Sequence, residues 1–192
     1  GLEVALGGTA LASCSGARIG AGRGGMRFVR GGVRLEPLQY GGPQERGRRA
    51  GREDVAAAVA VAAALTACAA QRVERRTAVR ALGNRLRRAL AGSGGRLTGD
   101  EPRLPNHASA VFPGSRGEDL LLALDLAGVA ASSGSACASG SLDPSHVLLA
   151  MGFSPQDSLS SLRLSAGWTT TESEVERAEV VLRSILAPLV RA

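Results

Sequence analysis

The chain has 192 residues and a net charge of +6, and it is 44% hydrophobic but only 3% aromatic. This length suits one good-sized domain, or a small domain with part of another, and its core must be built mainly from alanine, valine and leucine. All 23 basic residues are arginine. They are densest over 72–88, where the arginines recur at helical spacing and no aromatic residue lies between them. We interpret this run as a solvated helix face and therefore expect no nucleic-acid partner.

The first half of the chain begins with glycine-separated segments. Short strands are predicted over the first 35 residues, including 2–6 and 26–29. Residues 36–52, rich in glycine, proline and arginine, are predicted to form an irregular loop. One long helix is predicted from 53 to 90, with acidic residues in its first turn and glycines after its end. Because Gly1 opens directly into a predicted strand, we expect an upstream half to be missing from this sequence.

Strands and helices alternate from residue 96 onward, which predicts a compact α/β unit. Strands are expected at 107–112, 128–132 and 162–165. Helices are expected at 118–127, 144–151 and 171–190, with Asp143 capping the second and Thr171 capping the third. A domain boundary is expected along the long helix.

The cysteines are Cys14, Cys68 and Cys137, an odd number without a CxxC pair. Only His107 and His146 could join them in a metal site, so neither a zinc site nor a disulfide scaffold is predicted. Reduced thiols fit a cytoplasmic protein. The apolar stretch 55–70 is shorter than a bilayer span, so no membrane helix is predicted.

A glycine-rich segment, GAGRGG at 20–25, matches a dinucleotide-binding pattern. That interpretation needs a following helix whose N-terminus holds the pyrophosphate. A strand-like segment follows instead, so we reject it.

Two residues of the second half are candidates for chemistry. Cys137 lies in a loop of small residues, 132–141, which would leave a thiol open to solvent, whereas Cys68 lies in an apolar helix and is expected to be in the core. Arg163 lies inside a predicted strand and needs a partner there. A substrate carboxylate and a structural salt bridge are both compatible with this arginine.

Several motifs together resemble the C-terminal half of cysteine desulfurases, the NifS/IscS-like members of the class V aminotransferase superfamily. The motifs occur in order along nearly the whole chain: GGPQERGRRAG (41–51), PNHAS (105–109), FPG (112–114), SSGSAC (132–137), PSHVL (144–148), RLS (163–165) and WTTTE (168–172). The cysteine-loop motif is the most specific of them.

The resemblance implies the C-terminal part of a fold-type I PLP-dependent transferase, with the end of the large-domain sheet, a long linking helix and a small α/β domain. The corresponding ranges are 1–52 for a remnant of the PLP-binding large domain, 53–95 for the linking helix and 96–192 for the small domain with the cysteine loop. The family transfers sulfur from L-cysteine to an active-site cysteine as a persulfide, for iron–sulfur cluster or thio-cofactor assembly. Cys137 matches that cysteine, and Arg163 matches the arginine that holds the substrate carboxylate.

The sequence departs from the family where PLP is held. The family has a Ser-x-His-Lys segment, and alignment on Ser15 places Arg18 at the PLP lysine. A guanidinium stays protonated and forms no ordinary Schiff base, and the chain contains no lysine at all. Arg52 replaces a threonine that reaches the partner subunit's PLP phosphate, where an arginine could still bind phosphate. PLP is therefore implied by the family, while binding by this chain alone is doubtful.

Three hypotheses follow from the resemblance. The chain is a desulfurase relative whose own PLP chemistry is lost, or it works with another chain that carries the lysine and PLP, or it is a non-catalytic partner or sulfur acceptor of an intact desulfurase. In each case we expect a homodimer or a heterodimer with a desulfurase-type chain, a sulfur-acceptor or scaffold protein as a possible partner, and a cytoplasmic location without a membrane partner.

Overall fold

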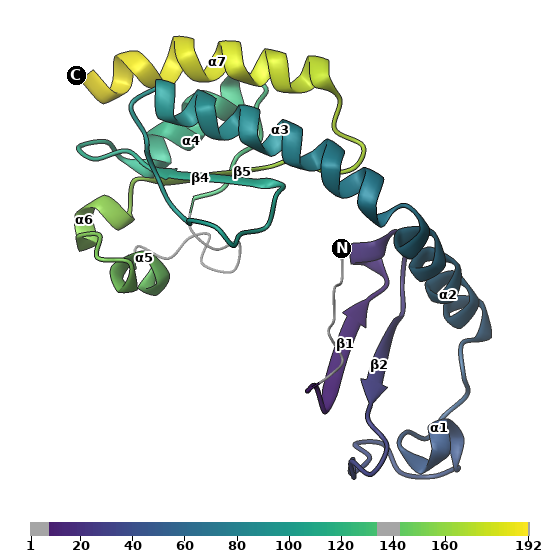
Figure 1. The fold of residues 1–192 in the computed structure, drawn as a ribbon. Coiled ribbons are helices and arrows are strands. Elements are labelled where there is room, and N and C mark those ends of the chain that lie inside the picture. The colour runs from purple at the N-terminus through teal and green to yellow at the C-terminus, as the bar shows by residue number, and fades with distance from the viewer. Residues whose placement is uncertain (1–7, 134–142, 192) are drawn as a thin grey trace. The chain divides into compact units, whose positions relative to one another are not determined.

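The structure is a computed structural model that describes residues 8–133 and 143–191 (Figure 1). The chain divides into two compact units, Gly1–Val73 and Glu74–Ala192, and each has its own sheet. The predicted strand at 2–6 lies outside the described residues.

The sheet of the first unit is an antiparallel hairpin of β1 (Leu11–Ser15) and β2 (Gly25–Val29). A 3-10 turn, η1 (Ala17–Ile19), lies in the connection between them. Gly16 donates its N–H to the carbonyl of Gly24 at 2.8 Å, and a Cβ at Gly16 would lie 2.8 Å from the same oxygen. Only glycine allows this close approach, so the segment that follows Ser15 is fixed by backbone contacts.

The predicted loop at 36–52 contains only the short helix α1 (Gln44–Gly47), in which Glu45 and Arg46 have positive φ. α2 (Val55–Ala70) then begins at Asp54, whose carboxylate accepts the N–H of Ala57 at 3.0 Å as an N-cap. α2 contacts β2 and η1, and Val61 is its one fully buried residue within the described part of the chain.

The predicted single helix over 53–90 is in fact two helices. α2 ends at Gln71, which has a non-helical ψ of 7°, and α3 (Arg72–Gly92) follows at once. Hydrophobic periodicity does not register a one-residue interruption, because both flanking segments keep a helical pattern. Within the described chain no single helix is long and apolar enough to cross a bilayer; only α2 and α3 taken together, as a broken pair, meet that length and composition.

The second unit is built on an antiparallel sheet in the order β3 (Arg96–Leu97), β4 (His107–Val111), β5 (Ser161–Ser165). The register of the central pair places His107 opposite Ser165 and Val111 opposite Ser161. Side chains alternate between the two faces of such a sheet, so Leu162 and Leu164 point away from the polar residues of β5.

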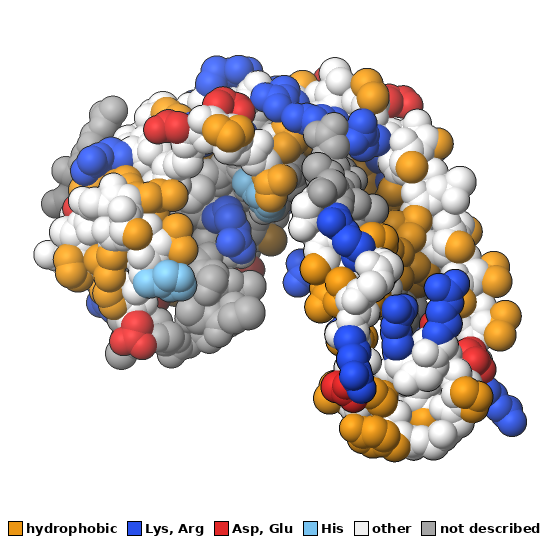
Figure 2. All heavy atoms as spheres, turned by 60° about the horizontal axis from the view of Figure 1, so that its bottom comes forward, with side chains coloured by type: hydrophobic (Ala, Val, Ile, Leu, Met, Phe, Trp, Pro, Cys, Tyr) orange, Lys and Arg blue, Asp and Glu red, His pale blue; other side chains and the backbone are white. Residues whose placement is uncertain are grey.

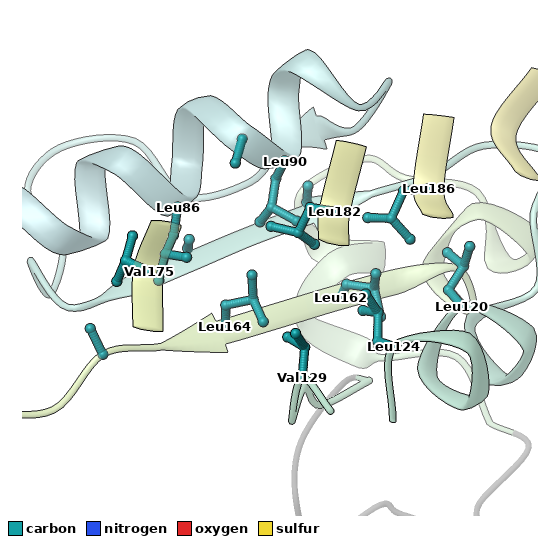
Figure 3. Packing of buried hydrophobic residues seen from close by; sticks show 14 of the residues in the cluster. Leu86, Leu90, Leu120, Leu124, Val129, Leu162, Leu164, Val175, Leu182 and Leu186 are labelled. Carbon is teal, nitrogen blue, oxygen red and sulfur yellow. The ribbon is translucent and has the colours of Figure 1, made fainter. Parts of the chain in front are cut away.

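Helices cover the apolar face of this sheet. They are α3, α4 (Gly117–Leu126) and α7 (Glu172–Arg191), which lie on the same side of β4 and β5 in Figure 1. Figure 3 shows the side chains that meet between helices and strands, and ten of them are labelled: Leu86, Leu90, Leu120, Leu124, Val129, Leu162, Leu164, Val175, Leu182 and Leu186. The core is therefore mainly aliphatic, as the composition predicts, and Phe112 is the one aromatic residue among the buried residues of the described cluster.

The short helices α5 (His146–Ala150) and α6 (Pro155–Ser158) lie on the other side of the sheet (Figure 1). Two local predictions are wrong here. The N-cap of α5 is Ser145 rather than Asp143, since its hydroxyl accepts the N–H of Leu148 at 3.5 Å. The strand predicted at 128–132 is reduced to one bridge between Ser132 and Arg163.

The remaining predicted elements of this unit are confirmed within a residue or two. The predicted cap of α7 is a reciprocal capping box, in which the Glu174 carboxylate accepts the N–H of Thr171 at 2.7 Å and the Thr171 hydroxyl accepts the N–H of Glu174 at 3.3 Å. The mixed α/β fold class is likewise confirmed.

Candidate functional site

Arg163 lies at the middle of β5, on the face of the sheet that the core helices leave uncovered. It pairs with Ser109 of β4, and its strand neighbours Leu162 and Leu164 are buried on the opposite face. Alternation along β5 therefore places Arg163 on the same face as Ser161.

A pocket of about 200 Å³ lies at this face. Its lining combines one guanidinium, four hydroxyl groups and three apolar side chains: Arg163, Thr98, Ser109, Ser145, Ser161, Val147, Leu148 and Met151. A small anionic molecule with a short apolar part would match these groups, since a guanidinium offers a fork of donors to a carboxylate.

The main chain at the start of the predicted cysteine loop is hydrogen-bonded to Arg163. Ser132 accepts the N–H of Arg163 at 2.7 Å and donates its own N–H to the Arg163 carbonyl at 3.0 Å. On the far side of the loop, Ser145 lines the pocket. The start of the loop is thus bonded to the Arg163 backbone and the segment after the loop lines the Arg163 pocket, while Cys137 itself lies outside the described residues.

The electrostatic surroundings of Arg163 include a histidine. His107 is half-buried on β4, and its Nδ1 lies 2.7 Å from the Ser165 hydroxyl. Burial and, second, the positive charge of Arg163 lower the pKa of His107 below its ordinary value. Within residues 8–133 and 143–191 no carboxylate lies at salt-bridge distance from Arg163. Among these residues, then, nothing supports the structural salt bridge that the sequence left open.

The other three predicted site residues belong to the first unit. Ser15 is the last residue of β1, Arg18 lies in η1, and Arg52 lies in the segment between α1 and α2. All three are exposed, and in the described part of the chain the Arg18 side chain makes neither a hydrogen bond nor an ion pair. Arg52 accepts a hydrogen bond at its carbonyl from Arg49 at 3.4 Å. Ser15 and Arg18 thus lie in consecutive elements of the first unit, whereas Arg163 belongs to the second unit.

The residues present do not fit the amine-capturing part of a PLP site. The chain has no lysine, and Arg18 occupies an exposed turn whose neighbours Gly16 and Gly24 contribute only backbone. The described residues also contain no group of three metal-ligating side chains.

Sequence reasoning did not find the pocket or the pairing of His107 with Ser165. The alternation of polar and apolar residues along 107–111 and 161–165 could have indicated a shared polar face. The antiparallel register that joins the two strands is not visible in either segment alone.

Comparison with known proteins identifies relatives that match most of the chain. Residues 28–178 match the family model described as aminotransferase class-V. A cysteine desulfurase of Gluconacetobacter diazotrophicus is 44% identical over 183 residues, which cover 93% of this chain and 46% of that protein. The cysteine desulfurase NifS of Azotobacter vinelandii is 39% identical with the same two coverages.

Solved structures show the same similarity. A NifS-like protein matches with a TM-score of 0.81 at 30% identity, covering 95% of this chain and 47% of that one. A NifS-like protein from Rickettsia africae matches with a TM-score of 0.80 at 27% identity, covering 93% and 48%. The chain thus spans about half the length of the relatives that it matches.

Proposed function

This chain belongs to the class V aminotransferase family, among the cysteine desulfurases, and from that premise we propose that it keeps the family's sulfur-handling residues and has lost its own capture of PLP. The family reaction moves sulfur from L-cysteine to an active-site cysteine as a persulfide. In this chain Cys137 would carry the sulfur, and Arg163 would hold the substrate carboxylate. Alone, the 192 residues would not turn over cysteine.

The replacement of the PLP lysine by Arg18 carries this proposal. A lysine amine loses its proton readily enough to attack the coenzyme's aldehyde, whereas a guanidinium stays protonated and delocalised. Arg18 is exposed in η1, and no lysine elsewhere in the chain can replace it.

The Arg163 pocket supports the retained half of the proposal. Cys137 is four residues after Ser133, which follows the Ser132–Arg163 bridge. An extended chain spans at most about 3.6 Å per residue, so Cys137 is tethered within about 14 Å of Ser133. That tether is short enough for a thiol to reach a molecule bound at Arg163.

Borohydride reduction tests the loss of PLP capture. We expect no pyridoxyl group on any side chain of the purified protein after incubation with PLP and borohydride, and no sulfide from L-cysteine. Peptide mapping separates the background reaction of the terminal amine from side-chain adducts. The variant Arg18→Lys should be trapped more readily than Arg23→Lys, a matched control with its new lysine five residues away. A side-chain pyridoxyl adduct on the unchanged protein would refute the proposal.

A second candidate function is that of a sulfur acceptor or partner of an intact desulfurase, as a homodimer or heterodimer in the cytoplasm. The backbone bonds between Ser132 and Arg163 and the place of Ser145 in the pocket lining favour it, since a thiol in the loop between these two residues suits transfer of sulfur.

Mass spectrometry distinguishes the acceptor role. With an intact desulfurase and L-cysteine, a gain of about 32 Da, one sulfur, is expected on Cys137. Cys14 and Cys68 provide internal controls in the same chain, and Cys137→Ser should abolish the gain. If turnover by the mixture instead depends on Cys137, the chain contributes to an assembled enzyme; an unmodified Cys137 would exclude the acceptor role.

A further inference from the structure

His107 lies beside the proposed carboxylate site without belonging to its pocket. Arg163 pairs directly with Ser109, and His107 pairs with Ser165, so His107 and Arg163 are diagonal neighbours on one face of an antiparallel pair. Diagonal neighbours of this kind lie about 7–8 Å apart, within reach of long side chains. The protonation of His107 therefore depends on the charge at Arg163.

We propose that His107 is a positioning residue of the Arg163 site, and that its protonation strengthens the binding of a carboxylate there. This inference rests on the proposed carboxylate site. When neutral, His107 can accept a hydrogen bond at Nδ1 from the Ser165 hydroxyl. When protonated, it must donate from Nδ1 to the Ser165 oxygen, which turns the hydroxyl proton outward as a donor.

Burial and a neighbouring cation favour the neutral form of His107 in the absence of a ligand. Burial first, and second the charge of Arg163 on β5, lower the pKa of His107. Arg103 in the preceding loop is the other cation close to the residue: it donates to the His107 carbonyl at 3.4 Å, and Glu101 lies 3.3 Å from its guanidinium. Since Arg103 is paired with a carboxylate, Arg163 is the cation whose neutralisation by a ligand would matter most to the ring.

The sign of the coupling follows from linkage. A carboxylate bound at Arg163 removes the repulsion that disfavours the charged imidazole, so binding raises the pKa of His107. Reciprocally, affinity for the carboxylate rises as the pH falls through that pKa. Taking the separation of diagonal residues, about 7–8 Å, as that of the two charges, Coulomb's law between the dielectric constant of water and that of a protein surface gives a gain of roughly three- to forty-fold in affinity.

Ring NMR signals of the full chain provide the test, with lactate as the probe because its carboxylate stays ionised across the pH range. The chain has two histidines, so His146→Gln assigns the signals. We expect saturating lactate to raise the His107 pKa and the lactate Kd to be lower near pH 5.5 than near pH 8. His107→Gln should remove the pH dependence, and His107→Asn keeps a polar partner for Ser165 if the first variant does not fold.

The outcomes separate the two proposals. Lactate binding that is independent of pH, or a pH dependence that persists in the His107 variants, overturns the role of His107 alone. Absence of lactate binding at every pH, or binding unchanged in Arg163→Gln, overturns the carboxylate site as well. The wild-type titration decides the question even without a variant, because an unchanged His107 pKa under saturating lactate refutes the coupling.

Discussion

Gly83 is the point at which α3 touches the loop that leads into β4, and its replacement gives the sharpest test of the packing behind the site. A Cβ built on Gly83 overlaps the carbonyl oxygen of Pro105 and comes within 3.4 Å of the Asn106 Cα. Asn106 in turn exchanges hydrogen bonds with Ala166, which fixes the end of β5. Gly83→Ala must therefore push α3 away from the entry to β4.

The expected loss is that of overpacking a closed core, about 1–3 kcal/mol of the free energy of unfolding. Gly92→Ala is the matched control, because Gly92 ends the same helix and its added Cβ meets nothing within 4 Å. That change should be neutral or stabilise by up to about 1 kcal/mol, since alanine is the better helix former.

Urea unfolding followed by tryptophan fluorescence measures both variants. Trp168 is the one tryptophan of the chain, and it lies 4.4 Å from the Arg75 guanidinium, within the second unit. Its signal therefore reports the unit that contains Gly83. A midpoint for Gly83→Ala equal to that of the wild type, with an unchanged slope, would refute the account of this contact.

Two further predictions concern stability. Leu124→Ala, at a fully buried position of α4, should lower the free energy of unfolding by about 2–5 kcal/mol, whereas Leu126→Ala, at a residue 80% exposed on the same helix, should change it by less than about 0.5 kcal/mol in the same assay. Hydrogen bonds from Arg85, at 3.0 and 2.9 Å, hold the pKa of Glu179 below its ordinary 4.5 in the folded protein. The ionised Glu179 therefore stabilises the fold above pH 4.5, and this contribution to the free energy of unfolding is lost as the pH falls through the lower, folded-state pKa. Glu179→Gln should flatten that part of the stability profile measured by urea midpoints between about pH 2 and pH 6, and a profile identical to that of the wild type would contradict the assignment.

Much of the second unit could be predicted because its signals are local. The apolar alternation around Leu162 and Leu164 indicates a strand, and the Thr171–Glu174 spacing indicates a capped helix; both are correct. The errors also have local causes. Ser145 rather than Asp143 caps α5 because two candidates, two residues apart, compete for one helix start. The break at Gln71 leaves the helical pattern of both flanking segments unchanged.

The sequence alone determined the chemistry that this chain can offer: a thiol at Cys137, an arginine at Arg163, and an arginine rather than a lysine at position 18. These are properties of single residue types and of motif order, which need no coordinates. The tertiary structure decided which groups share a face, because the β4–β5 register makes His107 a diagonal neighbour of Arg163, and a separate bridge pairs Ser132 with Arg163. Such pairings join segments far apart in the chain, and no periodicity within one segment encodes them.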